Sequence, residues 1–104
     1  MDVFKTNPEI FVTGANILKA IAHPQRLCVI NTLCEKERIN VTDMQDCLGE
    51  VQSTVSQHVS KLKAANIIVG RREGTNIFYS IENQELRNTL KELIKVLFNG
   101  SNPS

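Results

Sequence analysis

The sequence has almost no net charge, no long apolar run and no glycine-rich phosphate loop. Twelve basic and eleven acidic residues leave the 104-residue chain at +1, which excludes a globally basic nucleic-acid wrapper but not a locally basic reader. No run of about 18 apolar residues is present, so no membrane span is expected, and the N-terminus lacks the pattern of a signal peptide. We expect one cytoplasmic domain over residues 1–104, with a core at about 9–98 and flexible ends.

Residues arranged for catalysis are also missing. Ser53 and His58 lie on one helical stretch, without an orienting acid nearby and without the sharp turn that activates a serine nucleophile. A chain of this length has no room for a cofactor domain beside a substrate domain. The sequence therefore predicts a protein that is not an enzyme and that holds no cofactor.

Hydrophobic periodicity predicts five helices, a short β segment and one β-hairpin. Thr42 is placed as the N-cap of the third helix, and Gly49 ends it. The hairpin begins at residues 67–69, turns through the charged stretch 71–75 and returns as a strand over 76–81. This order is that of a helix-turn-helix followed by a wing, which is a mainly α winged helix-turn-helix fold with a β-hairpin. The expected helices cover residues 9–20, 24–35, 42–48, 51 to about 65 and 83–98, with the short β segment at 39–41.

The fourth helix has one apolar face and one polar face. Its apolar positions are spaced by four, four and three residues, at Val51, Val55, Val59 and Leu62. Short hydroxyl and amide side chains occupy the rest of the helix, and such groups suit base edges and phosphates in a major groove. The candidate DNA contacts on this helix are Gln52, Ser53, Thr54, Ser56, Gln57, His58, Ser60 and Lys61.

Basic residues gather in the part of the chain that contains this helix and the hairpin. Residues 51–81 contain four basic residues and one acidic residue, whereas residues 1–50 contain five basic and seven acidic residues. The near-neutral total therefore conceals a basic half of the molecule, as expected for a small reader of duplex DNA. The candidate DNA contacts at the hairpin are Arg71, Arg72, Thr75 and Asn76.

Three stretches resemble the signature sequences of one family. They are LKAIAHPQRL at residues 18–27, QSTVSQHV at 52–59 and RREGTNIFY at 71–79. In this order and spacing they are similar to the ArsR/SmtB family of bacterial homodimeric winged-helix repressors. The resemblance implies that the first and last helices pair with those of a second subunit, that the fourth helix enters the major groove of double-stranded DNA, and that the wing touches the backbone or the minor groove. A repressor of this kind is expected to bind a palindromic operator, with one half-site per subunit.

The last helix indicates a dimer independently of the resemblance. It carries six large apolar residues, more than the core of so short a chain should need. Contact between two copies of the chain accounts for them, and the alternative is that all six pack internally. The candidate interface residues on the first and last helices are Ile10, Ile17, Leu18, Leu86, Leu90, Leu93 and Leu97.

The residues that bind metal in the family are replaced in this chain. Matching along the sequence puts the Cys-x-Cys positions of the resemblance at Asn40 and Thr42, neither of which is a soft-metal ligand. A second family site, on the paired last helices, matches positions of which only Glu85 could bind a metal. Those positions are Asn83, Glu85, Val96 and Asn99. We therefore expect no metal site and no response to metal.

The three cysteines leave a second function open, because an odd number cannot all pair within one chain. Cys34, near the end of the second helix, and Cys47, in the third, could approach each other and act as a reversible thiol switch, with Cys28 as a further candidate. The alternative is that all three are small buried hydrophobic residues. A third possibility is a dimeric protein-interaction module that has lost DNA binding.

Overall fold

The structure is a computed structural model that describes residues 3–99. Within this range the predicted order of elements is confirmed, and the second helix has the predicted bounds. The flexibility expected of residues 1–2 and 100–104 lies outside the described residues. None of the helices in the described range is both long and apolar enough to cross a membrane. The elements are α1 (Pro8–Ile21), α2 (Pro24–Glu35), β1 (Ile39–Asn40), α3 (Val41–Leu48), α4 (Gln52–Ala64), β2 (Val69–Glu73), β3 (Asn76–Ser80) and α5 (Gln84–Phe98).

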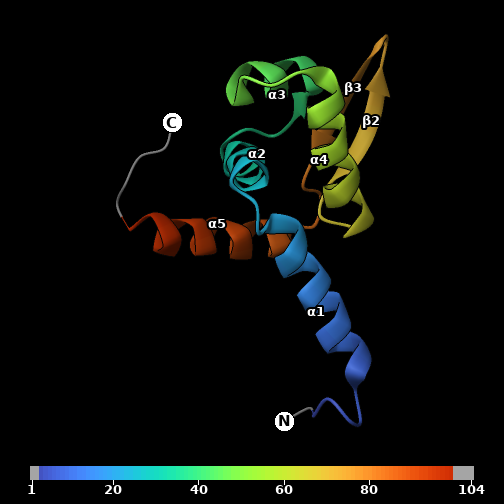
Figure 1. Ribbon diagram of the computed structural model, residues 1–104, viewed down its shortest axis with the longest axis vertical. Helices are drawn as coiled ribbons and strands as arrows, with labels where there is room; N and C mark the ends of the chain where they lie inside the picture. Colours follow the sequence, from blue (N-terminus) through green and yellow to red (C-terminus); the bar gives the residue numbers. More distant parts are fainter. Residues whose placement is uncertain (1–2, 100–104) are drawn as a thin grey trace.

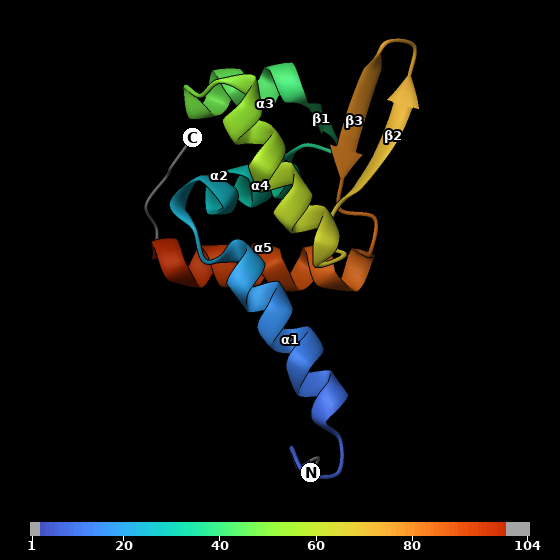
Figure 2. The same cartoon turned by 45° about the vertical axis from the view of Figure 1, so that its right-hand side comes forward.

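Helix α2 lies at the centre of the molecule, between α5 on one side and the α3–α4 pair on the other (Figure 1). The β2–β3 hairpin stands beside α4, and α1 projects away from this body, so that only its C-terminal end packs against it (Figures 1 and 2). Aliphatic side chains from all these elements meet in one core, which fixes α4 with one face inward. The largest fully buried side chains are Ile30, Leu33, Ile39, Met44, Val55, Leu62 and Ile67.

The turn between α3 and α4 is set by residues at the helix ends. The Oδ1 atom of Asn40 accepts a hydrogen bond from the backbone N–H of Asp43 at 2.8 Å, so the prediction that Thr42 caps α3 was wrong and the helix begins earlier, at Val41. Gly49 ends α3 in the left-handed conformation, at φ 64°, as the sequence predicts. Val51, expected on the apolar face of the next helix, is instead its N-cap and is 61% exposed.

The first strand of the wing lies later in the chain than the sequence predicted. The three strands form an antiparallel sheet in the order β1–β3–β2, and the turn between β2 and β3 is short, with Gly74 at φ 63°. Arg71 and Arg72 therefore lie on strand β2 and not in the turn. The strand predicted at Ile67–Ile68 is absent, and both side chains are buried ahead of β2, because a short apolar run signals burial without fixing the backbone conformation.

Gly70 and Tyr79 face each other across β2 and β3. A Cβ atom at Gly70 would lie 2.8 Å from Cε1 of the Tyr79 ring, so any side chain at this position would displace the ring. The ring is buried, and Tyr79 also pairs with Ile39 on strand β1. This close approach joins the wing to the body of the protein.

Candidate nucleic-acid interface

Helix α4 presents a polar face to solvent. Its other face packs into the core through Val55, Val59 and Leu62, which leaves short hydroxyl and amide side chains on the outside. Such side chains let a helix enter a major groove about 12 Å wide and reach base edges at hydrogen-bonding distance. Of the residues predicted to contact DNA from this helix, Thr54 is half-buried, and the exposed ones are Gln52, Ser53, Ser56, Gln57, Ser60 and Lys61.

His58 does not belong to this polar face. Its side chain is 7% exposed, and its Nε2 atom lies 2.8 Å from Oε1 of Gln25 while its Nδ1 atom lies 3.4 Å from Nη1 of Arg26. The prediction that His58 contacts DNA was therefore wrong. Arg26 of α2 is buried as well, because each of these polar groups finds its hydrogen-bond partner on another helix.

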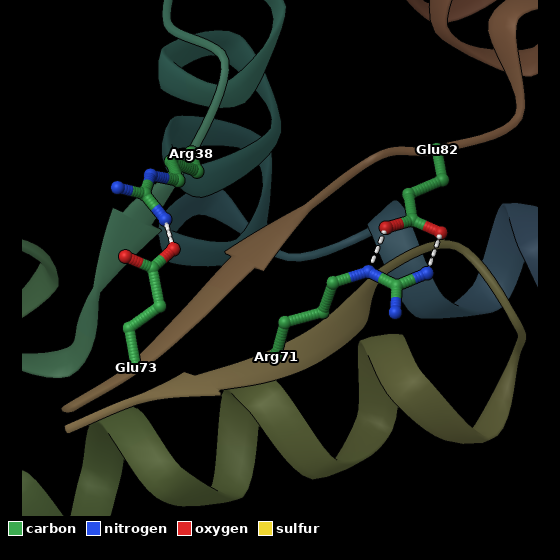
Figure 3. A network of polar contacts seen from close by, with 4 residues as sticks. All are labelled: Arg38, Arg71, Glu73 and Glu82. Carbon is green, nitrogen blue, oxygen red and sulfur yellow. Dashed lines mark hydrogen bonds and ion pairs between the residues drawn. The ribbon is translucent and has the colours of Figure 1, made fainter. Parts of the chain in front are cut away.

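Arg71 is held by an ion pair at the base of the wing (Figure 3). Its Nε and Nη2 atoms donate to the two carboxylate oxygens of Glu82, at 2.5 and 2.8 Å. The hydrogen bond lowers the pKa of Glu82 and raises the pKa of Arg71, so both groups keep their charge. A DNA phosphate that binds Arg71 has to compete with this carboxylate. Arg72, the next residue on β2, is exposed and has no ion pair within residues 3–99.

A second arginine–glutamate pair braces the wing from the other side. Arg38, just before β1, pairs with Glu73 at the end of β2 (Figure 3), and its guanidinium carbon lies 4.1 Å from the centre of the Phe78 ring, a cation–π distance. The sequence did not predict that Glu73 and Glu82 form ion pairs with arginines, because the partners in each pair come from different segments of the chain. Of the two arginines on β2, Arg71 is therefore paired with a carboxylate, and within residues 3–99 Arg72 is not.

A polar groove of about 270 Å³ runs between the wing and the helix-turn-helix. Thr75 and Asn76, predicted as DNA contacts, face it from the wing, and Gln52 faces it from the start of α4. Thr42 and Gln45 of α3 line the opposite wall. The sequence analysis considered Thr42 as a cap and a metal position and did not name Gln45, which carries no local signal. The polar surface of α4 therefore continues across this groove onto α3.

The predicted dimer residues divide into two groups. Leu90 is 3% exposed and belongs to the core of the single chain, so its assignment to the interface was wrong. The apolar residues that face inward on α5 pack against α2. Half-buried against the same core are Ile17, Leu86 and Leu93.

The outer apolar positions of α1 and α5 remain exposed. Among the predicted interface residues these are Ile10, Leu18, at 60% exposure, and Leu97, at 53%. Helix α1 is apolar around most of its projecting half, where little else of the chain covers it (Figure 2). Large apolar side chains on an unpaired helix mark an interaction surface. Three further exposed apolar residues on these helices were not among the predicted interface residues, and they are Phe11, Val12 and Val96.

The three cysteines are free in the structure, and a thiol switch between Cys34 and Cys47 stays a prediction. Cys34 is buried and faces α5, with its Sγ atom 3.9 Å from the carbonyl oxygen of Arg87. The exposed Cys47 is instead close enough to Cys28 for the two to interact electrostatically. Burial, and then the charge of Cys47, raises the pKa of Cys28, and burial likewise raises the pKa of Cys34. A raised pKa disfavours the thiolate, which is the form that reacts with oxidants.

The side chains at the family's metal positions have structural roles here. Asn40 caps α3, and Oδ1 of Asn83 accepts a hydrogen bond from the backbone N–H of Leu86 at the start of α5, at 3.1 Å. Across residues 3–99, no group of three or more His, Cys, Asp and Glu side chains is arranged to hold a metal ion. That the protein does not respond to metal stays a prediction.

No family model matches the chain, but individual relatives do. It is 39% identical to the transcriptional repressor PagR of Bacillus anthracis over 79 residues, which cover 76% of this chain and 79% of PagR. It is 31% identical to the transcriptional repressor SmtB of Mycobacterium tuberculosis over 86 residues, 83% of this chain and 63% of SmtB. The crystal structure of NolR from Sinorhizobium fredii matches 97% of this chain and 99% of NolR, with a TM-score of 0.78 at 29% identity. That of PagR matches 82% of this chain and 97% of PagR, with a TM-score of 0.72 at 36% identity.

The arrangement of α3, α4 and the β2–β3 hairpin, with the outer face of α4 polar and open, is that of a winged helix-turn-helix regulator of transcription. Sequence identity to PagR and SmtB extends over most of the chain and includes this region. The protein belongs to the ArsR/SmtB family, and both the fold class and the family predicted from the sequence are confirmed.

Proposed function

We propose that this protein represses transcription by binding an imperfectly palindromic operator as a homodimer, with one half-site per subunit. The observation that carries the proposal is the exposed polar face of α4 beside a wing with a free arginine. A two-fold dimer presents two such helices, and a palindromic DNA site has the matching symmetry. A repressor of this kind acts in the cytoplasm of a bacterial cell.

Each part of the surface has a separate role in this proposal. Gln57 and Ser60, exposed on α4, are placed to contact base edges in the major groove. Arg72, Thr75 and Asn76 on the wing are placed to contact the phosphate backbone or the minor groove. Base contacts then select the operator, and backbone contacts supply affinity that depends on salt.

The projecting half of α1 and the outer edge of α5 form the proposed dimer interface. Leu18 on α1 and Leu97 on α5 are 60% and 53% exposed, and burying the rest of each side chain favours association by roughly 1–2 kcal/mol. Both helices lie at the end of the molecule opposite α3 and the tip of the β2–β3 hairpin (Figure 1). Pairing them with a second copy therefore covers both surfaces and leaves α4 and the wing open.

Footprinting on the DNA upstream of the protein's own gene tests this proposal. We expect protection of two half-sites whose centres are about 10–10.5 base pairs apart, or a multiple of that spacing, by a complex containing two chains. Protection that does not depend on sequence, or a complex with one chain per site, would contradict the proposal. No DNA binding at all would favour the protein-interaction module.

A DNA mobility-shift assay with and without a thiol oxidant addresses the redox alternative. Burial raises the pKa of Cys28 and of Cys34, which speaks against a fast thiol switch. We therefore expect operator affinity to be equal before and after mild oxidation. A reversible loss of binding, restored by a reductant, would favour the redox-responsive repressor.

A further inference from the structure

A cluster of polar side chains lies between α2 and α4, on the side of α4 that faces away from solvent. The amide nitrogen Nε2 of Gln25 donates to Oε2 of Glu50 at 3.0 Å. The amide oxygen of Gln25 lies 2.8 Å from Nε2 of His58, and Nη1 of Arg26 lies 3.4 Å from Nδ1 of the same ring. Helix α4 is thus fixed to α2 by hydrogen bonds as well as by apolar packing.

The directions of these hydrogen bonds define the protonation state of His58. Because the Gln25 nitrogen donates to Glu50, its oxygen is the atom that meets the ring, and a carbonyl oxygen can only accept. The Nε2 atom of His58 must therefore carry a hydrogen. The Nδ1 atom faces the guanidinium of Arg26, which can only donate, so Nδ1 must be without one. The ring is neutral, with its single proton on Nε2.

The cluster cannot accommodate a second proton on His58. That proton would sit on Nδ1, directed at the cation of Arg26, in a site that is mostly buried. Arg26 is itself held, because its Nε atom donates to the carbonyl oxygen of Ala20 at the end of α1, at 2.5 Å. Since Arg26 has no acceptor to offer, protonation of His58 sets two cations against each other, and the polar part of the contact between α4 and α2 is weakened.

We propose that this cluster makes DNA binding sensitive to protons: α4 is held in its reading position while His58 is neutral, and acidification releases α4 and weakens operator binding. This inference rests on the proposed function. Gln25 and Arg26 are positioning residues in it, since they act on DNA only through His58 and α4.

The charged groups around His58 favour the neutral ring. Burial lowers the pKa of His58 most, the charges of His23, Arg26 and Lys61 lower it further, and only the carboxylate of Glu50 opposes them. The ring of His23 lies 4.6 Å from that of His58, centre to centre. The stabilising effect of the neutral ring is fully present above the ordinary histidine value of 6.5. It is lost as the pH falls from there through the lowered pKa of the folded protein.

General electrostatics predicts the opposite pH dependence. A histidine that gains a positive charge close to DNA phosphates adds to the attraction, so binding would strengthen in acid. Weaker binding in acid therefore separates the proposed positioning role of His58 from a simple charge effect.

The experiment measures operator affinity at constant ionic strength between about pH 7.5 and about pH 5.5, a range that spans ordinary histidine titration. We expect the wild-type protein to weaken by about fivefold or more, the lower end of typical coupling between sites. His58→Gln offers an N–H to Gln25 and does not titrate, so its affinity should stay flat with pH. His23→Asn is the matched control, because asparagine keeps the acceptor that caps α2 and should keep the weakening in acid.

Several results would overturn the inference. One is wild-type binding that stays constant or strengthens in acid, and another is a pH dependence abolished by His23→Asn and kept by His58→Gln. Nitrogen NMR of the wild-type ring gives a test that needs no variant: we expect hydrogen on Nε2 and a titration below 6.5, and a Nδ1–H tautomer would refute the cluster. Absence of DNA binding at every pH would overturn the proposed function itself, a different outcome from pH-independent binding.

Discussion

Removing one side chain from α4 and one from the wing should impair DNA binding in two different ways. Gln57→Ala deletes an amide from the exposed face of α4, and Arg72→Ala deletes a guanidinium from β2. Both side chains lie outside the core, so each change should alter the free energy of unfolding by no more than about 0.5 kcal/mol. Gln57→Ala should lose the preference for the operator over random DNA, whereas Arg72→Ala should weaken binding to both.

The two effects can be given magnitudes. A good base contact discriminates by about 1–3 kcal/mol, and a dimer loses it at both half-sites, so the operator preference should fall at least about 30-fold. A lost phosphate contact lowers the slope of log affinity against log salt by about 0.9, or about 1.8 for two subunits. Between about 50 and 200 mM salt, the wild-type protein should then lose about 12-fold more affinity than Arg72→Ala loses.

Anisotropy titrations of a labelled operator and a labelled random duplex, repeated at several salt concentrations, measure both quantities. Gln84→Ala is the control, since Gln84 is exposed at the start of α5 and its side chain donates a hydrogen bond to Asn88 on the same helix. It should match the wild-type protein throughout. If Gln57→Ala keeps the wild-type preference, α4 is not the reading helix. If Arg72→Ala keeps the wild-type slope, the wing does not meet phosphate.

Three variants and the addition of metal test the interface, the wing and the metal prediction. Leu18→Glu on the exposed face of α1 should give a folded monomer in sedimentation, and a dimer would place the interface elsewhere; Leu90→Ala, in the core, should keep the dimer but lower the free energy of unfolding by about 2–5 kcal/mol. Glu82→Gln frees Arg71, so affinity for all DNA should rise and the salt slope should steepen by about 0.9 per subunit; an unchanged slope would show that Arg71 stays away from phosphate. Zinc or cadmium at low micromolar concentration should leave operator affinity unchanged, because Asn40 stands where a thiolate is needed; one tight site per chain in calorimetry would contradict this.

The sequence was sufficient for the parts of the fold that local patterns control. Helix α2 follows from its apolar spacing and from a proline at its first position, and Gly49 marks the end of α3 because a left-handed residue there favours glycine. The polar face of α4 follows in the same way, since Val55, Val59 and Leu62 define the buried side of a helix without reference to any other segment.

The sequence was insufficient wherever a residue's environment comes from another segment. Ile67 and Ile68 have the composition of a strand, yet they fill the core, while the exposed strand β2 has no alternating pattern to reveal it. His58 looks like its exposed neighbours on α4, and only partners contributed by α2 show that it is buried. The division of the α5 leucines between core and surface, as for Leu90 and Leu97, also depends on where α2 lies.

The contact between Gly70 and Tyr79 provides the protein with a built-in optical probe. The chain has no tryptophan and one tyrosine, so its intrinsic fluorescence comes from the single ring at the junction of the wing and the body. That ring is buried against a glycine backbone, and any movement of β2 relative to β3 changes its surroundings. A change in emission during unfolding or acidification of the unlabelled protein can therefore be assigned to one known place in the fold.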